Sequence, residues 1–224
     1  MRIVVRIGGS VVANPINTQL LAKYADIIVL LKQQGHEVVV VVGGGALARQ
    51  FIGFAKELEL AMEAQDEVAI SCSRLFAQLF LKKLDKYTGN KVSVTLEEAA
   101  EELTMGHIVV MGGLKPGITT DTVATLVAEK IAADMLLKGS DQQGVYNKDP
   151  RKHTDAVKLD HLSFEELSAV FDQNEHKAGI HQIIDPEAVK ILKSNRIKTV
   201  VVSGFEPQNM LAAVRGENIG TIIS

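Results

Sequence analysis

Runs of apolar, largely β-branched residues alternate along the chain with stretches in which apolar residues recur every three or four positions. The runs predict β-strands and the periodic stretches predict amphipathic helices. The expected strands cover residues 3–7, 38–42, 91–95, 108–111, 135–138, 199–203 and 219–223. Strands that alternate with helices are joined by crossover connections. The pattern therefore predicts an α/β fold with a mainly parallel central sheet sandwiched between helices.

Two stretches carry the helical pattern most clearly. The first spans residues 17–34, ends at Gly35 and places six apolar residues on one face: Leu20, Leu21, Tyr24, Ile27, Ile28 and Leu31. The second spans residues 67–84, with the row Val68, Cys72, Leu75, Phe76, Leu79 and Phe80. The five consecutive valines at 38–42 predict a strand buried on both faces. No linker or repeat interrupts the chain, so we expect a single compact domain over residues 1–224.

The composition narrows the class of protein. Hydrophobic residues make up 46% of the 224 residues, which is enough for a large core. The net charge of −3 argues against a nucleic-acid partner, because binding to a phosphate backbone requires a clustered basic excess. No stretch reaches the roughly 18 apolar residues of a membrane helix, and a single cysteine suits a reducing compartment. We expect a cytoplasmic protein.

Three glycine-rich turns, at residues 8–10, 43–45 and 112–113, each follow a predicted strand. In open α/β sheets, ligands bind beyond the carboxyl ends of the strands. Glycine allows the backbone to approach a phosphate closely, and the N–H groups at the start of the next helix attract anions. A single turn of this kind can be a mere sharp bend, but three at one edge predict an anion-binding site.

Two familiar nucleotide motifs are weak or missing. Residues 43–48 fit the glycine fingerprint of dinucleotide-binding proteins, but the acidic residue at the expected spacing, Glu63, lies in a helical stretch with no strand before it. This disfavours a dehydrogenase. No Gly-Lys pair is present, so the chain has no Walker A loop. A nucleoside triphosphate would have to bind through a different set of loops.

The third glycine turn continues through Pro116-Gly117 to two adjacent threonines and Asp121. We expect Thr120 and Asp121 to cap a helix that begins near Thr122. Capping accounts for Asp121, but it does not account for two adjacent threonines after a Pro-Gly turn. Their hydroxyls and the helix N–H groups favour contact with a phosphate or a carbonyl.

A second candidate loop runs from Lys138 to Pro150. It leaves a strand, turns at glycines and presents Ser140 and one aromatic side chain, Tyr146. Such a loop suits a nucleotide, with the base against the ring and the phosphates near the cation. A plain surface hairpin is the alternative.

Taken in order, these motifs resemble those of the amino-acid-kinase family over essentially the whole chain. Arg6-Ile7-Gly8-Gly9-Ser10 resembles the family's opening Lys-x-Gly-Gly-Ser, residues 42–45 its second turn, and residues 140–150 its nucleotide loop. Within the family, Thr119-Thr120-Asp121 resembles the mark of the uridylate kinases, and residues 43–49 resemble the archaeal type. The resemblance implies the amino-acid-kinase fold, with an acceptor-binding half at about 1–130 and an ATP-binding half at about 131–224.

The resemblance also implies roles for individual residues. The implied ATP-binding residues are Gly9, Ser10, Gly45, Arg49, Ser140, Tyr146 and Asp149. The implied UMP-binding residues are Gly44, Asp66, Leu114, Lys115, Pro116, Gly117, Ile118, Thr119 and Thr120. The implied catalytic residues are Arg6, Asp121 and Lys138. The chain departs from the family in two places, because Arg6 replaces a phosphate-binding lysine and Gln142-Gln143-Gly144 replaces Val-Asp-Gly.

The implied reaction transfers the γ-phosphoryl group of ATP to UMP, giving UDP for pyrimidine nucleotide biosynthesis, with Mg²⁺ accompanying ATP. The acceptor phosphate is already an anionic nucleophile, so positioning and charge neutralisation should dominate catalysis. We expect Arg6 and Lys138 to neutralise charge and Asp121 to orient them. The six histidines show no metal-ligand spacing, so no metal site in the protein is expected.

The resemblance further suggests a homohexamer. Two other functions remain open on the same fold. One is a kinase with a carboxylate acceptor such as acetylglutamate, which should lack the paired threonines. The other is a nucleotide-binding protein without catalysis.

Overall fold

The computed structural model describes residues 1–172 and 183–224. Within these residues, the main sheet has the strand order β3-β2-β1-β4-β8-β9-β7. Its strands are β1 (Arg2–Ile7), β2 (Glu37–Val42), β3 (Val109–Met111), β4 (Met135–Ser140), β7 (His161–Leu162), β8 (Thr199–Ser203) and β9 (Thr221–Ile223). Only the pairing of β8 with β9 is antiparallel, so the predicted mainly parallel α/β sheet is confirmed. β5 (Val145–Tyr146) and β6 (Lys158–Leu159) form a separate antiparallel ribbon.

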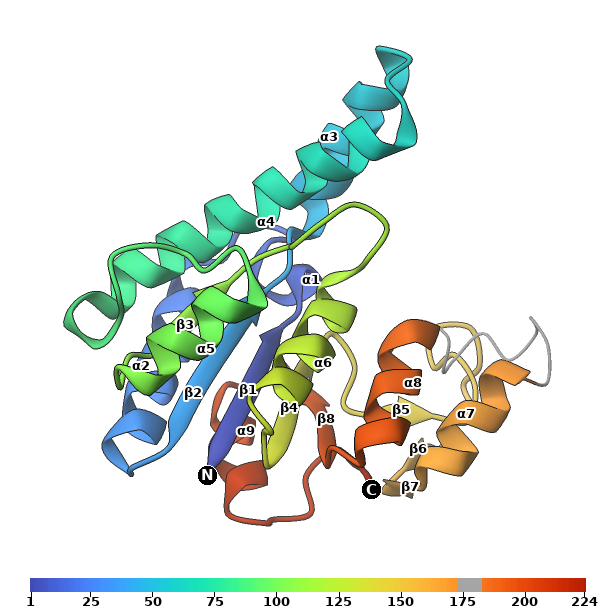
Figure 1. Ribbon diagram of the computed structural model, residues 1–224. Helices are drawn as coiled ribbons and strands as arrows, with labels where there is room; N and C mark the ends of the chain where they lie inside the picture. The colour runs from blue at the N-terminus through green and yellow to red at the C-terminus, as the bar shows by residue number, and fades with distance from the viewer. Residues whose placement is uncertain (173–182) are drawn as a thin grey trace.

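Helices cover both faces of the sheet, because alternate residues of each central strand point to opposite sides. One core is built from Ile3, Val5 and Ile7 of β1 with residues of the helices on that face. These helices are α1 (Gly9–Val12), α2 (Thr18–Gln33), α4 (Met62–Leu84) and α9 (Gln208–Val214). The other core contains Val4 and the helices α5 (Leu96–Thr104), α6 (Thr120–Lys130), α7 (Phe164–Asp172) and α8 (Pro186–Asn195). Figure 1 shows this arrangement, with α3 (Gly45–Glu57) and the start of α4 projecting beyond the sheet.

Residues 38–42 of β2 are fully buried, as the run of valines predicts. The other predicted elements differ in detail. The strand predicted at residues 91–95 is wrong, because only Ser93 makes an isolated bridge, to Met111. Two residues of the predicted apolar row on α4 do not belong to its buried face, since Leu75 and Leu79 are 63% and 51% exposed. No helix among the described residues is long and apolar enough to span a bilayer.

The strand order places a topological switch point at the centre of the sheet. The chain runs outward from β1 through β2 to β3 and then returns to β4 on the opposite side of β1. Since β1, β2 and β3 are parallel neighbours, the three glycine turns that follow them lie at one edge. The prediction that these turns share an edge is therefore confirmed. In sheets of this kind, ligands bind at the switch point.

Candidate functional site

Three charged side chains meet at the switch point. Arg6 of β1 and Lys138 of β4 are register partners on adjacent parallel strands. Both approach Asp121 in the first turn of α6, whose Oδ1 lies 2.8 Å from Arg6 Nε and 2.5 Å from Lys138 Nζ. The side chain of Lys138 is only 6% exposed, and the other two side chains are mostly buried. The fold thus brings together the three residues that the resemblance marks as catalytic.

Burial and charge act in opposite directions on this cluster. Burial raises the pKa of the Asp121 carboxyl, but Arg6 and Lys138 outweigh it and hold the pKa below its usual range. Burial lowers the pKa of Lys138 to about 8, although the attraction of Asp121 opposes this shift. Within the described chain, Arg6 Nε is buried without an aligned hydrogen-bond acceptor, so its contact with Asp121 is an ion pair. The Arg6 guanidinium therefore contributes its positive charge to the site while Asp121 holds it in place.

Thr119 and Thr120 serve different purposes, and this corrects the predicted start of the helix. Thr119 is the N-cap of α6, because its Oγ1 accepts from the N–H groups of Asp121 and Thr122 at 3.0 and 3.2 Å. The helix begins at Thr120, so the predicted capping by Thr120 and Asp121 is wrong. Thr120 Oγ1 instead accepts from Arg6 Nη2 at 3.1 Å. Among the described residues Thr120 donates to no acceptor, which leaves its proton for a ligand.

The turns after β1 and β2 touch each other backbone to backbone. A Cβ at Gly9 would lie 2.2 Å from Gly45 N, and a Cβ at Gly45 would lie 2.3 Å from Gly9 O. Gly45 also has a φ of +60°, which side chains rarely tolerate. The helix α3 begins at Gly45 without a side-chain cap, and the Ala46 N–H donates to Ala13 O at 3.1 Å. Among the described residues, no acceptor meets the N–H groups of Gly45 and Leu47, so these two can donate to an anion.

A pocket of about 150 Å³ adjoins the cluster, with which it shares Thr120. Its lining includes six of the residues that the resemblance assigns to UMP: Gly44, Asp66, Lys115, Ile118, Thr119 and Thr120. The rest of the lining is apolar or small: Ala48, Ala69, Ile70, Ser73 and Gly113. Gly117 contributes differently, because its N–H donates to Asp66 Oδ2 at 2.8 Å and holds the loop against α4. Its φ of +83° is the conformation that a Pro-Gly turn requires at glycine.

Three side chains that the sequence did not single out anchor the acceptor loop, residues 112–119. Ser73 Oγ accepts from Gly113 N–H at 2.8 Å. Arg74 donates to the carbonyl oxygens of Gly113 and Leu114, both at 2.9 Å. At the far end, Asp185 Oδ2 accepts from the Thr119 hydroxyl at 2.6 Å. The only sequence signal for these anchors is Asp185-Pro186, a dipeptide typical of helix starts.

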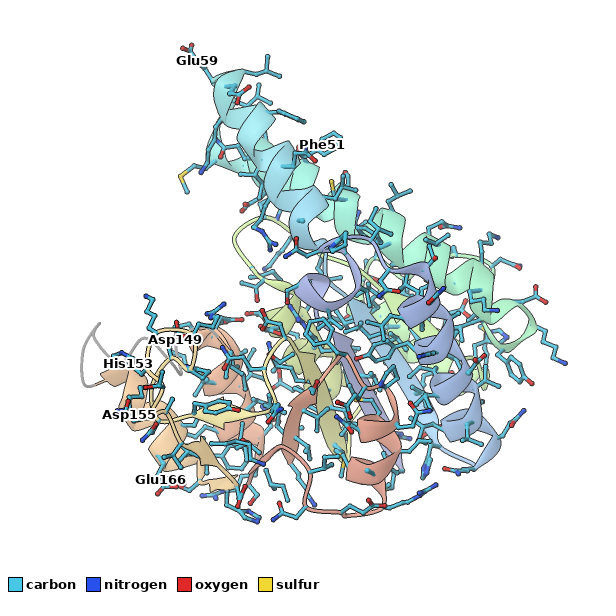
Figure 2. The ribbon with its side chains drawn as sticks, turned by 180° about the vertical axis from the view of Figure 1, so that it is seen from behind. Phe51, Glu59, Asp149, His153, Asp155 and Glu166 are labelled. Carbon is cyan, nitrogen blue, oxygen red and sulfur yellow. The ribbon has the colours of Figure 1, made fainter. Side chains whose placement is uncertain are left out.

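The residues that the resemblance assigns to adenosine lie around β4 and the ribbon that follows it. Ser140 is buried at the end of β4, and Tyr146 belongs to β5. Asp149 accepts from the backbone and side-chain N–H groups of Arg151 at 3.0 and 3.1 Å, and these bonds lower its pKa. Figure 2 shows Asp149 near His153 at this side of the molecule.

Two further residues that the resemblance assigns to ATP, Ser10 and Arg49, lie in helices. Ser10 lies in α1 and is half-buried, whereas Arg49 is exposed on α3. In the described ranges, no hydrogen bond or ion pair joins Arg49 or Tyr146 to the central cluster. Gln142, at the departure from the family motif, has a buried Oε1 that accepts no hydrogen bond from any described group. This oxygen can accept a hydrogen bond from a ligand.

The chemistry of the site is that of anion binding. Two cations, a threonine proton and uncapped helix N–H groups converge beside a pocket with one carboxylate, Asp66. Within residues 1–172 and 183–224, no three His, Cys, Asp or Glu residues lie close enough to hold a metal ion. His176 and His181 lie outside the described residues.

Comparisons with known protein families, sequences and solved structures give consistent results. A model of the amino acid kinase family matches residues 1–203. The chain is 41% identical over 225 residues to a uridylate kinase from Methanocaldococcus jannaschii, covering 100% of this chain and 99% of that protein. It is also similar to the crystal structure of uridylate kinase from Archaeoglobus fulgidus, with a TM-score of 0.90, 38% identity and full coverage of both chains. The UMP kinase of Bacillus anthracis shares the fold, with a TM-score of 0.83, 22% identity and coverage of 100% and 95%.

Proposed function

The chain belongs to the amino acid kinase family, and from this premise we propose that it is a UMP kinase. It transfers the γ-phosphoryl group of ATP to the phosphate of UMP, giving UDP for pyrimidine nucleotide synthesis. The observation that carries the proposal is the convergence of Arg6 and Lys138 on one oxygen of Asp121, beside a pocket lined by Asp66 and Thr120. Full-length similarity to archaeal uridylate kinases supports UMP as the acceptor.

The mechanism follows from the charges of the substrates. The UMP phosphate is itself the nucleophile, so no protein base is needed, and the main barrier is repulsion between two polyanions. Arg6 and Lys138 offset this repulsion at the transferring group, and Thr120 and the N–H groups at the start of α3 add hydrogen bonds. Asp121 takes no proton, because the two cations hold its pKa low. Its task is to keep both cations aimed at one point.

The order of strands supports two functional halves. Strands β3, β2 and β1 come from residues 1–130, and β4, β8, β9 and β7 come from residues 131–224. The boundary between these groups is the contact of β1 with β4, where Arg6 faces Lys138. In the proposal, UMP binds over the first half and the adenosine of ATP over the second, near Ser140 and Tyr146.

Mg²⁺ belongs to the proposal as the companion of ATP. It binds mainly to triphosphate oxygens and water and needs at most one or two carboxylates from a protein. The site fits this mode, because its donors are arranged for phosphate rather than for a bare cation. When bound, Mg²⁺ would neutralise charge on the β- and γ-phosphates. The proposal also includes a cytoplasmic homohexamer.

A coupled assay of ADP release tests the function. The purified protein is supplied with Mg-ATP and, in turn, UMP, CMP, dUMP or acetylglutamate. We expect turnover with UMP, because Asp66 and the threonine loop form a nucleotide pocket. Turnover with acetylglutamate alone would favour a carboxylate kinase on this fold. ATP binding without turnover on any acceptor would favour a non-catalytic nucleotide-binding protein.

A further inference from the structure

Asp185 joins two helices that come from different halves of the chain. Its Oδ2 accepts from the Thr119 hydroxyl at 2.6 Å, and its Oδ1 accepts from the Thr122 hydroxyl at 2.8 Å. Oδ1 also accepts from Ala188 N–H at 2.9 Å, which makes Asp185 the N-cap of α8. The helices α6 and α8 pack side by side (Figure 1). One carboxylate therefore ties the first turn of α6 to the start of α8.

The Thr119 hydroxyl passes this constraint on to the catalytic cluster. A hydroxyl has one proton to donate and two lone pairs to accept with. Because Thr119 gives its proton to Asp185, its lone pairs face the N–H groups of Asp121 and Thr122. Those bonds fix the backbone from which the Asp121 carboxylate reaches Arg6 and Lys138.

We propose that Asp185 is a positioning residue for phosphoryl transfer, which sets the first turn of α6 through the Thr119 proton and so aims Asp121 at the two cations. The proposal rests on the proposed function for the identity of the reaction. Asp185 acts through Thr119, so its loss should lower kcat more than it weakens the binding of either substrate. Its charge also raises the pKa of Lys138, which gives a second measurable effect.

A simpler role for Asp185 would be to cap α8 and nothing more. That role does not account for all of its hydrogen bonds. An N-cap requires one oxygen that accepts from the helix N–H groups, and serine provides it as well as aspartate does. The bonds to Thr119 and Thr122 cross to another helix and contribute nothing to that cap. Asp185→Ser therefore keeps the cap of α8 and removes the link to α6.

Asp185→Asn provides a second variant of nearly the same shape. Its single side-chain oxygen can take the place of Oδ1, which accepts from Ala188 N–H and Thr122, or the place of Oδ2, which accepts from Thr119, but it cannot occupy both places. Its NH₂ group cannot accept the Thr119 proton at all. Asn17→Ser is the matched control, because Asn17 is the N-cap of α2, outside the cluster.

The experiment measures kcat, the KM of each substrate and the thermal unfolding midpoint. It compares the wild type with Asp185→Ser, Asp185→Asn, Asn17→Ser, Thr119→Val and the double variant of Thr119→Val with Asp185→Ser. We expect Asp185→Ser and Asp185→Asn to lower kcat by about tenfold to hundredfold, as misplacement of catalytic groups does. The KM for ATP should stay close to that of the wild type, and the unfolding midpoint should fall only by what the loss of the bonds to Thr119 and Thr122 costs. Asn17→Ser should keep the wild-type kcat. Adding Thr119→Val to Asp185→Ser should cause a total loss smaller than the sum of the two single losses, because both changes break the same link; Thr119→Val also removes the N-cap of α6, so some further loss remains.

Three results would overturn the proposal. The first is a wild-type kcat in both folded Asp185 variants. The second is loss of folding in both, which would make Asp185 a purely structural residue. The third is full additivity of the losses from Thr119→Val and Asp185→Ser.

Failure of the proposed function is a separate outcome. If the wild-type protein phosphorylates no acceptor, the kinase assignment fails. The Asp185 link can still be read from the pKa of Lys138 by NMR titration. Removal of the Asp185 charge should lower that pKa in both variants, and an unchanged pKa would show that Asp185 does not act on the cluster.

Discussion

Arg6 and Lys138 are two like charges held side by side, and a single oxygen of Asp121 keeps them there. Such a cluster is stable because the carboxylate offsets the repulsion between the cations. Its total charge is still positive, so an incoming phosphate is attracted. At the scale of single residues, the site therefore depends on which protons these three groups hold and where they point.

Replacement of Arg6 tests its part in charge neutralisation. Arg6→Ala should lower kcat by about 10²–10³, the usual effect of removing one donor from a stabilised transition state, and should weaken UMP binding far less. Arg6→Lys keeps the charge but loses the bond to Thr120, so its kcat should lie between those of the wild type and the alanine variant. Steady-state kinetics with thermal melting as a folding control measure both. An unchanged kcat in Arg6→Ala would remove Arg6 from the mechanism.

The pKa of Lys138 predicts how activity depends on pH. Burial lowers this pKa from its ordinary 10.5 to about 8, and the protonated form is the one that neutralises phosphate. The kcat/KM of the free enzyme should therefore fall as pH rises through about 8. Lys138→Arg remains charged at all these pH values and should lose this alkaline limb. A flat profile between pH 7 and 9 in the wild type would contradict the assignment.

Lys138 should also make the stability of the protein depend on pH, but in the opposite direction: stability should rise over the pH range in which activity falls. Because the folded-state pKa lies below 10.5, the unfolded chain holds this proton to higher pH than the folded chain does. The contribution of Lys138 to the free energy of unfolding thus rises between about pH 8 and 10.5. A loss of activity above pH 8 is then not explained by unfolding at Lys138.

At the scale of elements, the site is built from helix starts and strand ends that touch. The turns after β1 and β2 meet at Gly9 and Gly45 with no room for a side chain. The acceptor loop is held by α4 at its beginning and by α8 at its end. These contacts determine the distance between the donor and acceptor sides of the site.

Two glycine-to-alanine substitutions test this close contact. One places a Cβ against the neighbouring backbone, and the other places it in open space. In Gly9→Ala, the new Cβ would lie 2.2 Å from Gly45 N, so the turns must move apart. We expect a loss of about 1–3 kcal/mol in the free energy of unfolding, typical of overpacking, together with a large loss of kcat. Gly53→Ala on α3 is the control, because no atom lies within 4 Å of its Cβ. It should stabilise the helix by about 0.5–1 kcal/mol and leave kcat unchanged. Chemical denaturation measures the free energy of unfolding of the two variants, and steady-state kinetics measure their kcat.

In the molecule as a whole, α3 and the start of α4 project beyond the sheet and the helices that cover it (Figure 1). The helix α3 exposes Phe51, which Figure 2 labels, and Phe54. The two rings lie edge to face, with centroids 5.8 Å apart. Leu75 and Leu79 of α4 are also exposed. The exposed pair of Phe51 and Phe54 is the kind of apolar surface found at protein–protein contacts, which supports the proposed homohexamer.

Sedimentation tests this assembly. The wild type should sediment at six times the 24.2 kDa mass of one chain. Phe54→Glu should yield smaller species, because a charge replaces apolar surface in the interface. Gln50→Glu adds the same charge to an exposed position of α3 without removing apolar surface, so it should assemble normally. A wild type that sediments as a single chain would contradict the proposal.

Local sequence patterns were enough to predict the class of fold and the edge of the sheet at which the site lies. The periods of strands and helices are local properties, so β1, β2, β4 and β8 and the two long helices could be predicted from the chain alone. The strand predicted at residues 91–95 was wrong, because a short apolar run does not show whether it has a neighbour to pair with. The glycine turns, each next to its own strand, were also local signals.

The hydrogen-bond partner of each polar side chain, in contrast, became known only from the folded structure. Thr119 rather than Thr120 caps α6, and Asp121 forms ion pairs with two cations, one from β1 and one from β4. Asp185 meets Thr119 across 66 positions of the chain. No local pattern encodes such a pairing, because it depends on how helices from distant parts of the sequence pack on a common sheet. The physical reason is that hydrophobic periodicity specifies which face of an element is buried, whereas a hydrogen bond requires the position of both partners in space.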